Sequence, residues 1–288
     1  MKIAAVVVWY NPQNLKDPLA NIKSYCSKCE KIYIVDNSSL NNKNLAEQIK
    51  NAVYIPLFNN LGIAKALNTG CSKAFEDGFE WCMTMDQDSI WKDKELENFI
   101  KKFQQKYTED SLIKSFAPQI KNPVNHSFLG NIKKMFFKEA ELKDEFVHRV
   151  ICSGNIINLK TFIEIGKFNE EFFIDEVDHE YCFRLIQNNY KIFQFNSILL
   201  NHQLGECKKT FFPNTQHTLI RSYYIIRNSL YVIEHYPDFA KEYSYKKNLA
   251  KHKRTLLLFS GFKFFKNLKM IKKAYSDYKN GLWGKYKD

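Results

Sequence analysis

The amino-acid sequence predicts an α/β protein with a mostly parallel sheet flanked by helices. In its first third, short β-rich apolar runs alternate with segments of helical spacing, which is the order that produces parallel strands joined by crossover helices. Residues 3–10 are almost all apolar, as expected of a strand buried on both faces. Ligands in such sheets bind beyond the carboxyl ends of the strands, so the residues that follow the strands are the first candidates for a site.

The order of elements follows from the spacing of apolar residues and from the residues that stop each run. The predicted elements of the first third are a strand over 3–10, a helix near 15–26, a strand ending at Asp36, a strand over 51–57, a helix over 63–77 and a strand over 81–85. Gly78 is a typical stop for the second of these helices. Three of the strands are thus followed by polar residues that would share one edge of the sheet.

The pattern after residue 93 is less regular. A charged helix near 93–106 and a strand around 112–117 are predicted, whereas residues 121–149 have no clear period and are expected to form an insertion or a mobile loop. The α/β pattern resumes at residue 150. We expect a main domain over 1–240 and a basic helical tail over 241–288.

Composition and charge narrow the classes of protein. Seven scattered cysteines, an odd number, indicate reduced thiols rather than a disulfide framework. No segment has the roughly 18 uncharged apolar residues of a membrane span, and the first apolar run lacks the features of a signal peptide.

The tail holds fourteen Lys and Arg against three acidic residues, which accounts for +11 of the net charge of +12. Because the charge is confined there and no nucleic-acid-binding motif is present, we expect no nucleic-acid partner.

The stretch "WCMTMDQDSI" ends an apolar strand on Asp86 and Asp88. Side chains two apart on a strand share a face, and two carboxylates at one place repel each other unless a cation lies between them. The hard cations Mg²⁺ and Mn²⁺ prefer such oxygen ligands. The stretch therefore predicts a divalent metal site, with a helix N-cap as the structural alternative.

Several motifs occur in a recognisable order: "VVVWYNP", "IVDNSS", "NNLGIAKALNTG", "MTMDQDS", "CSGNIIN", "GKFNEEFFIDEVDHEYCFRL" and "NHQLGE". With these motifs the chain resembles the family 2 glycosyltransferases, which are inverting enzymes with the GT-A nucleotide-sugar-binding fold, over about residues 3–235. It is most similar to the bacterial rhamnosyltransferases that extend surface polysaccharides from dTDP-L-rhamnose. Galactofuranosyl- and other hexosyltransferases that use UDP-sugars share much of the pattern, and a nucleotide-sugar-binding module without turnover is the non-enzyme alternative.

The resemblance implies a role for residues at each strand end. In the family's pattern the donor-side positions are Tyr10 and Asn11 beside the base, Asp36 on the base or ribose, Asn60, Gly62 and Asn68 near the phosphates, Asp86, and Ser153 and Gly154 beside the donor sugar. His202 corresponds to a histidine that completes the metal site with Asp86 and Asp88, although a structural histidine is an equal alternative. Arg227, with Arg221, would clamp the diphosphate or else lie on a solvated helix face.

The catalytic base is expected in "FIDEVDHEYCFRL", where four acids lie close together. Inverting transfer needs one carboxylate to take the proton of the acceptor hydroxyl. The family's base position falls on Asp178, and Asp175 is the second choice. An acidic helix N-terminus that offsets the helix dipole is the structural alternative.

The tail combines lysines with apolar residues at steps of three and four, which predicts basic amphipathic helices. Such helices bind anionic membrane surfaces, and a role in packing on the main domain is the alternative. We therefore expect a cytoplasmic enzyme, peripheral on the inner face of the cell membrane, with a nucleotide-sugar donor and a glycan or lipid-linked oligosaccharide acceptor.

Overall fold

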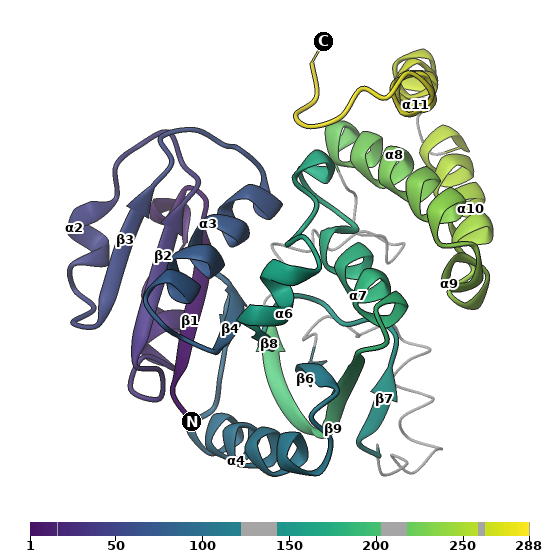
Figure 1. Ribbon diagram of the computed structural model, residues 1–288. Helices are drawn as coiled ribbons and strands as arrows, with labels where there is room; N and C mark the ends of the chain where they lie inside the picture. The colour runs from purple at the N-terminus through teal and green to yellow at the C-terminus, as the bar shows by residue number, and fades with distance from the viewer. Residues whose placement is uncertain (16, 122–142, 203–217, 259–262, 288) are drawn as a thin grey trace, which may run out of the picture.

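The computed structural model describes residues 1–15, 17–121, 143–202, 218–258 and 263–287. Across these residues the strands form one nine-stranded sheet, in the order β3-β2-β1-β4-β8-β6-β9-β5, with β7 paired to β9. Helices cover both faces of the sheet (Figure 1). Most of the segment predicted as an insertion, residues 122–142, lies outside the described residues.

The first four strands of this order are parallel and confirm the expected elements. They are β1 (Ile3–Trp9), β2 (Lys31–Asp36), β3 (Ala52–Pro56) and β4 (Trp81–Asp86). In β1 all seven residues are buried, which explains why the run is apolar without alternation. Since β1, β2 and β4 are in parallel register, their carboxyl ends meet at one edge of the sheet.

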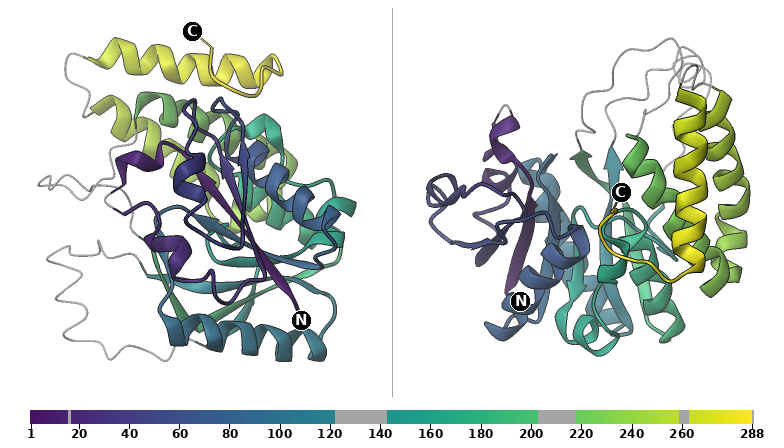
Figure 2. Two further views of the ribbon diagram at one scale, coloured as in Figure 1. Left: turned by 90° about the vertical axis from the view of Figure 1, so that its left-hand side faces the viewer. Right: turned by 90° about the horizontal axis from the view of Figure 1, so that it is seen from above.

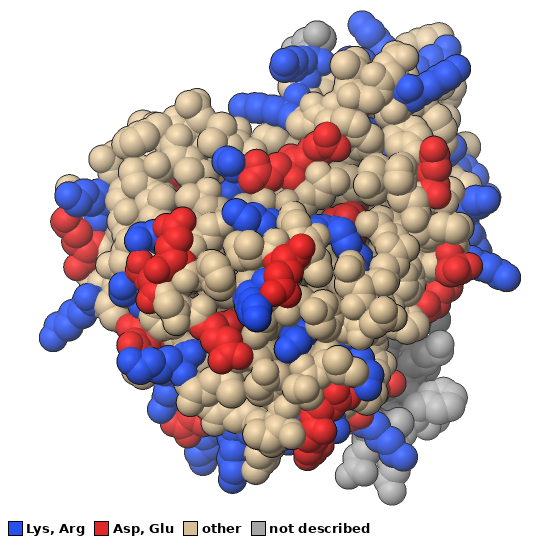
Figure 3. Space-filling view, in the orientation of Figure 1, with Lys and Arg blue, Asp and Glu red and all other residues tan. Residues whose placement is uncertain are grey.

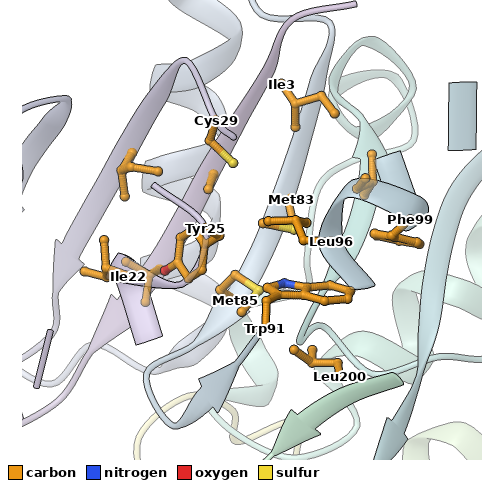
Figure 4. Close-up of a cluster of buried hydrophobic side chains, with 14 of the residues drawn as sticks. Ile3, Ile22, Tyr25, Cys29, Met83, Met85, Trp91, Leu96, Phe99 and Leu200 are labelled. Carbon is orange, nitrogen blue, oxygen red and sulfur yellow. The ribbon is translucent and has the colours of Figure 1, made fainter. Parts of the chain in front are cut away.

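Alternate residues of β1 enter two different cores. Odd-numbered residues such as Val7 face the cluster under α1 (Ala20–Lys23) and α4 (Asp93–Glu109), part of which is shown in Figure 4. Even-numbered residues such as Val6 face the cluster under the helices α3 (Ile63–Glu76), α6 (Leu159–Glu164) and α7 (Val177–Gln187). The sheet is therefore fixed from both sides, and the strand ends are held rigidly.

Beyond β4 the sheet is mixed rather than parallel. The remaining strands are β8 (Asn155–Asn158), β6 (Ile113–Lys121), β9 (Lys191–His202), β5 (Ser89–Ile90) and β7 (Glu145–Val147). β8 is antiparallel to both β4 and β6, whereas β6 and β9 are parallel. The short elements η1 (Pro12–Asn14), α2 (Lys43–Ala46) and η2 (Glu170–Phe172) lie in connections.

The C-terminal part is helical and packs on the rest of the molecule. Its helices are α8 (Leu219–His235), α9 (Pro237–Glu242), α10 (Tyr245–Leu258) and α11 (Phe264–Lys279). The expected boundary after residue 240 falls inside α9, and Ile271 and Ala274 of α11 share a buried cluster with Tyr223 of α8. Figure 2 shows α10 and α11 lying along α8. Among the described residues, no helix has both the length and the apolar character needed to cross a membrane.

Candidate functional site

The ends of β1, β2 and β4 are tied together by side chains that bind backbone. The amide of Gln87 accepts a hydrogen bond from Tyr10 N–H (2.9 Å) and donates one to Tyr10 C=O (3.2 Å). The N–H of Asn11 donates to the Ser38 hydroxyl (2.8 Å). The turn after β4 is thus fixed to the end of β1, while the Tyr10 ring, 48% exposed, stays available at this edge. Sequence reasoning overlooked Gln87, although it lies between the two predicted metal ligands.

Asp86 is the last residue of β4, and the segment 152–154 packs against it. Its N–H donates to the Ser153 hydroxyl (3.4 Å), and its C=O accepts from the Asn21 amide (3.2 Å). The Cys152 thiol donates to Asp86 Oδ1 (3.6 Å). Both Asp86 and Asp88 are partly exposed at this edge.

Ser153 and Gly154, which the motifs place beside the donor sugar, form a tightly packed turn next to Asp86. Ser153 is 1% exposed, and its hydroxyl donates to that of Ser89 (2.6 Å). Gly154 has a φ of +76°, and a Cβ atom there would lie 2.7 Å from the Leu200 side chain. The turn therefore needs glycine to fit against β9.

Asp178 lies in the first turn of α7 and also contacts Cys152. Its Oδ2 accepts from the backbone N–H of Cys152 (3.2 Å), and its Oδ1 accepts from the N–H of His179 (2.9 Å). Cys152 thus links the expected metal ligand Asp86, through its thiol, to the expected base Asp178, through its backbone.

The pKa of the Cys152 thiol is consistent with this bridging role. Burial raises it well above its ordinary value, and the charges of Asp86 and Asp178 raise it further. Cys152 therefore remains a protonated donor instead of a thiolate that would compete for a metal ion. The motif "CSGNIIN" points to Ser153 and Gly154, but nothing in it distinguishes Cys152 as a functional residue.

Asp175, the second choice for the base, is engaged elsewhere. Its Oδ1 accepts from Arg221 Nη2 (2.9 Å) and Nε (3.1 Å). A carboxylate paired with a guanidinium is a weaker proton acceptor. Between the two candidates, Asp178 is the one that the observed contacts connect to Asp86.

The structure corrects the expectation that Arg227 reaches a diphosphate. Its side chain is 0% exposed, and its guanidinium donates to the backbone carbonyls of Glu171 (3.0 Å) and Gly284 (3.0 Å). An arginine held in this way fixes the segment before α7 and the C-terminal segment. Arg221, the other member of the expected clamp, pairs with Asp175.

Asn68 and Gly62 are also structural, in contrast to their expected place near the phosphates. The Asn68 amide binds both the C=O (2.9 Å) and the N–H (3.0 Å) of Phe168 and is buried. A Cβ at Gly62 would lie 2.7 Å from the Phe173 carbonyl oxygen. A close backbone approach to Phe173 therefore accounts for the glycine at this position.

Asp36 is buried at the end of β2, where it organises the following loop. Its carboxylate is 1% exposed and accepts from Tyr54 (2.6 Å), Asn42 (2.8 Å) and the Ser38 N–H (3.1 Å). Burial and the hydrogen bond to Asp36 raise the pKa of Tyr54 to about 12, so the phenol remains a donor.

Asn60 plays a similar role in the next loop. Its carbonyl oxygen accepts from the Asn37 amide (3.1 Å) and the Gly62 N–H (3.1 Å). Through these contacts with protein groups, Asp36 and Asn60 hold the loops that follow β2 and β3.

His202 is at the end of β9, and its backbone pairs with Ser89, the residue after Asp88. The side chain of His202 lies outside the part of the structure that is described. In the described ranges, no three side chains of His, Cys, Asp or Glu lie close enough together to hold a metal ion. Protein ligands within these ranges would be the two aspartates, with other positions left to a bound ligand or water.

A cavity of about 280 Å³ adjoins the Cys152 bridge. Its walls include Gln119, Arg149, Ile151, Ser153, His179 and Gln194. Ser153 and His179 are the neighbours of Cys152 and Asp178 in the chain. The cavity thus lies beside the expected base and has both polar and apolar walls.

Comparison with known proteins agrees with this architecture. Residues 5–166 match a sequence model of the family described as glycosyl transferase family 2. The dTDP-rhamnosyl transferase RfbF of Shigella flexneri is 30% identical over 242 residues, covering 80% of this chain and 79% of the relative.

Solved structures with only 14% identity show the fold alone. TarS 1–349 of S. aureus, in complex with UDP-GlcNAc, superposes with a TM-score of 0.60 over 96% of this chain and 80% of that chain. GalNAc-T7 with UDP, GalNAc and Mn²⁺ also gives 0.60, over 88% of this chain and half of its own length. The fold is GT-A-like, and the chain belongs to glycosyl transferase family 2, with similarity to a dTDP-rhamnosyl transferase.

Proposed function

We propose that this glycosyltransferase transfers L-rhamnose from dTDP-L-rhamnose, with inversion, to a glycan or lipid-linked acceptor in bacterial surface polysaccharide synthesis. The similarity to a dTDP-rhamnosyl transferase supports the choice of donor. The observation that carries the mechanism is the Cys152 bridge, because it places Asp86 and Asp178 at the same edge of the sheet. At this edge, one carboxylate can bind a cation beside the leaving group while the other accepts the proton of the attacking hydroxyl.

Asp178 is the proposed base. The acceptor hydroxyl oxygen attacks the anomeric carbon from the side opposite the diphosphate, the bond from that carbon to the diphosphate oxygen breaks, and the hydroxyl proton passes to the Asp178 carboxylate. The backbone N–H groups of Cys152 and His179 both donate to the Asp178 carboxylate and restrict its orientation. The adjoining cavity is the proposed place of the acceptor sugar.

Asp86 and Asp88 are the proposed ligands of Mg²⁺ or Mn²⁺, with His202 as a third. The residues fit such an ion, because Asp86 and Asp88 are partly exposed oxygen donors at a strand end. Mg²⁺ sites commonly combine one or two carboxylates with the phosphates of a substrate. When bound, the ion would act as a Lewis acid that stabilises the departing diphosphate.

The donor site would use the edge formed by β1 and β2. The exposed Tyr10 ring is proposed to stack on the base, with Asn11 beside it. Asp36, Asn60, Gly62 and Asn68 would act indirectly by holding the loops of this edge, which differs from the direct contacts that the motifs implied.

A panel of nucleotide sugars tests the donor assignment. With Mn²⁺ present, we expect release of dTDP from dTDP-L-rhamnose in the presence of octyl glycosides of rhamnose, N-acetylglucosamine and galactose. Faster turnover of UDP-galactofuranose or another UDP-sugar would reassign the donor within the same family. Donor binding without turnover of any sugar would favour a binding module.

The C-terminal helices are the proposed membrane contact. Leu258 at the end of α10 is 70% exposed and Phe265 in α11 is 81% exposed. Lys263 and Lys266 flank Phe265, and Lys and Arg side chains gather over α10 and α11 (Figure 3). Exposed apolar side chains among lysines match an anionic lipid surface, so we infer a cytoplasmic enzyme bound to the inner face of the cell membrane.

The double substitution Leu258→Ser/Phe265→Ser tests this contact without removing a helix. We expect binding to vesicles that contain phosphatidylglycerol to weaken by about 100-fold or more, because each fully buried side chain of this size contributes about 1.5–3 kcal/mol and the variant loses two of them. Sedimentation with the vesicles measures the effect, and Leu112→Ser, an exposed leucine before β6, is the control. Equal vesicle binding by the double variant and wild type would exclude this surface.

A further inference from the structure

The segment before α7 is strained where it leads to Asp178. Phe173, Asp175 and Glu176 have φ values of 62°, 64° and 64°, in a region that residues other than glycine seldom adopt. Such conformations persist only where the surrounding structure holds them. Because Asp178 follows two residues after Glu176, its position depends on the contacts that hold this segment.

The first half of the segment is held by α8. The amide of Asn228 donates to the carbonyl oxygens of Ile174 (2.8 Å) and Asp175 (2.9 Å). Arg227 donates to the carbonyls of Glu171 and Phe172 (3.0 and 3.2 Å). These bonds end at Asp175, so they leave the start of α7 to other contacts.

The second half is held by α10. The Glu176 carboxylate accepts a hydrogen bond from the Tyr245 hydroxyl and, on the same oxygen, one from His179 Nδ1 (3.0 Å). Tyr245 is buried, and the side chains of Glu176 and His179 are largely buried. Burial raises the pKa of Glu176, but the hydrogen bond and charge of His179, the hydrogen bond from Tyr245 and the charge of Arg149 outweigh it. The pKa is lowered overall, so the carboxylate stays charged.

His179 connects this pair to the base. Its ring binds Glu176, while its backbone N–H donates to Asp178 Oδ1 (2.9 Å). A movement of Glu176 would therefore be passed to the group that orients the Asp178 carboxylate. Tyr245 itself belongs to the C-terminal region that the sequence pattern assigned to a separate tail.

We propose that Tyr245 is a positioning residue for the transfer reaction. Its hydrogen bond to Glu176 holds the first turn of α7 and thereby the direction of the Asp178 carboxylate toward Cys152. The C-terminal helices are then part of the catalytic unit as well as a surface for lipid. This inference rests on the proposed role of Asp178.

The substitution Tyr245→Phe removes the hydroxyl and keeps the buried ring. Glu176 retains its bond from His179, so we expect a partial loss, with kcat lower by about tenfold, which is less than the roughly 100-fold that a 1 Å misplacement of a catalytic group can cost. The KM and Kd for dTDP-L-rhamnose should stay unchanged. The matched control is Tyr243→Phe, because the Tyr243 ring packs against Arg149, 3.8 Å from its guanidinium carbon, and the contacts described for Glu176 do not include it.

Rates are measured with dTDP-L-rhamnose, Mn²⁺ and the octyl glycosides, and donor Kd by calorimetry. Hydrogen–deuterium exchange across residues 173–182 provides a readout that does not depend on the donor. We expect faster exchange in Tyr245→Phe and unchanged exchange in Tyr243→Phe. Glu176→Gln, which keeps the shape and removes the charge paired with His179, should lower kcat at least as much.

Wild-type kcat and unchanged exchange in Tyr245→Phe would overturn the inference, even if that variant melts at a lower temperature. Equal losses in both tyrosine variants, or full activity in Glu176→Gln, would also overturn it, since the effect would not pass through Glu176. Failure of the proposed function looks different. In that case wild type does not use dTDP-L-rhamnose, while the exchange experiment still decides whether Tyr245 holds the start of α7.

Discussion

Replacement of Asp178 by asparagine is expected to lower the rate of glycosyl transfer by about 10³-fold, within the range that general base catalysis contributes. The affinity for the donor should not change. Asparagine has nearly the same shape, and its side-chain oxygen can still accept from the Cys152 N–H, which lies 3.2 Å from the carboxylate in the structure. The amide cannot take a proton from the acceptor hydroxyl, so the chemistry is removed. Its NH2 group also cannot accept the hydrogen bond that the His179 N–H (2.9 Å) donates to the second carboxylate oxygen, so the substitution gives up one of the two bonds that orient this side chain.

Initial rates of dTDP release and calorimetric titration with dTDP-L-rhamnose measure these two quantities separately. Asp238→Asn, at an exposed position in the first turn of α9, is the control and should behave as wild type. Undiminished transfer by Asp178→Asn would exclude Asp178 as the base. Asp175 would then be the next candidate, although its carboxylate is paired with Arg221.

The parallel half of the sheet could be predicted because each of its strands has a local signature. β1 is apolar throughout, since helices cover both faces, and Gly78 ends the turn after α3. β5 and β7 have two and three residues and exist through their pairing with β9. Nothing in so short a run distinguishes a strand from a loop, so these strands and the change to mixed pairing were not predictable.

The site was predictable to the extent that it depends on strand ends. Asp86 and Asp178 are distant in the sequence, and the expected fold alone brings them to one edge. The roles of Arg227, Asn68 and Asp36 were not predictable in the same way. A buried arginine that binds carbonyls and an exposed one that binds phosphate have the same spacing on a helix, and only the packing of η2 and the C-terminal segment distinguishes them.

Cys152 and Gln87 show a further limit of motif reasoning. Each acts through contacts that a motif does not specify. Cys152 uses its backbone N–H and its thiol, and Gln87 uses its side-chain amide to bind the backbone of Tyr10. Together they fix the turn after β4 between the end of β1 and the start of α7.

Asp88→Asn is expected to raise the Mn²⁺ concentration needed for half-maximal activity by more than about 100-fold, since even outer-shell partners change metal affinity by about 10- to 100-fold. Asp86→Asn should have a similar effect. Asparagine at position 86 can still accept a hydrogen bond from the Cys152 thiol, so the bridge to Asp178 should persist. The weaker response to Mn²⁺ would then result from the missing negative charge. Treatment of wild type with EDTA should abolish transfer, and Mn²⁺ or Mg²⁺ should restore it.

The experiment is a Mn²⁺ titration of EDTA-treated enzyme, with donor Kd measured at each metal concentration. Asp110→Asn, a carboxylate before β6 that pairs with Lys191, is the matched control and should leave the titration unchanged. The two aspartate variants should lose donor affinity only when metal is present, because the ion and not the carboxylates would contact the diphosphate. Full activity of the EDTA-treated enzyme, or identical titrations for wild type and Asp88→Asn, would reduce the strand-end aspartates to a structural role in the turn after β4. The leaving diphosphate would then need cationic side chains of the protein, and Arg227 is too deeply buried to be one of them.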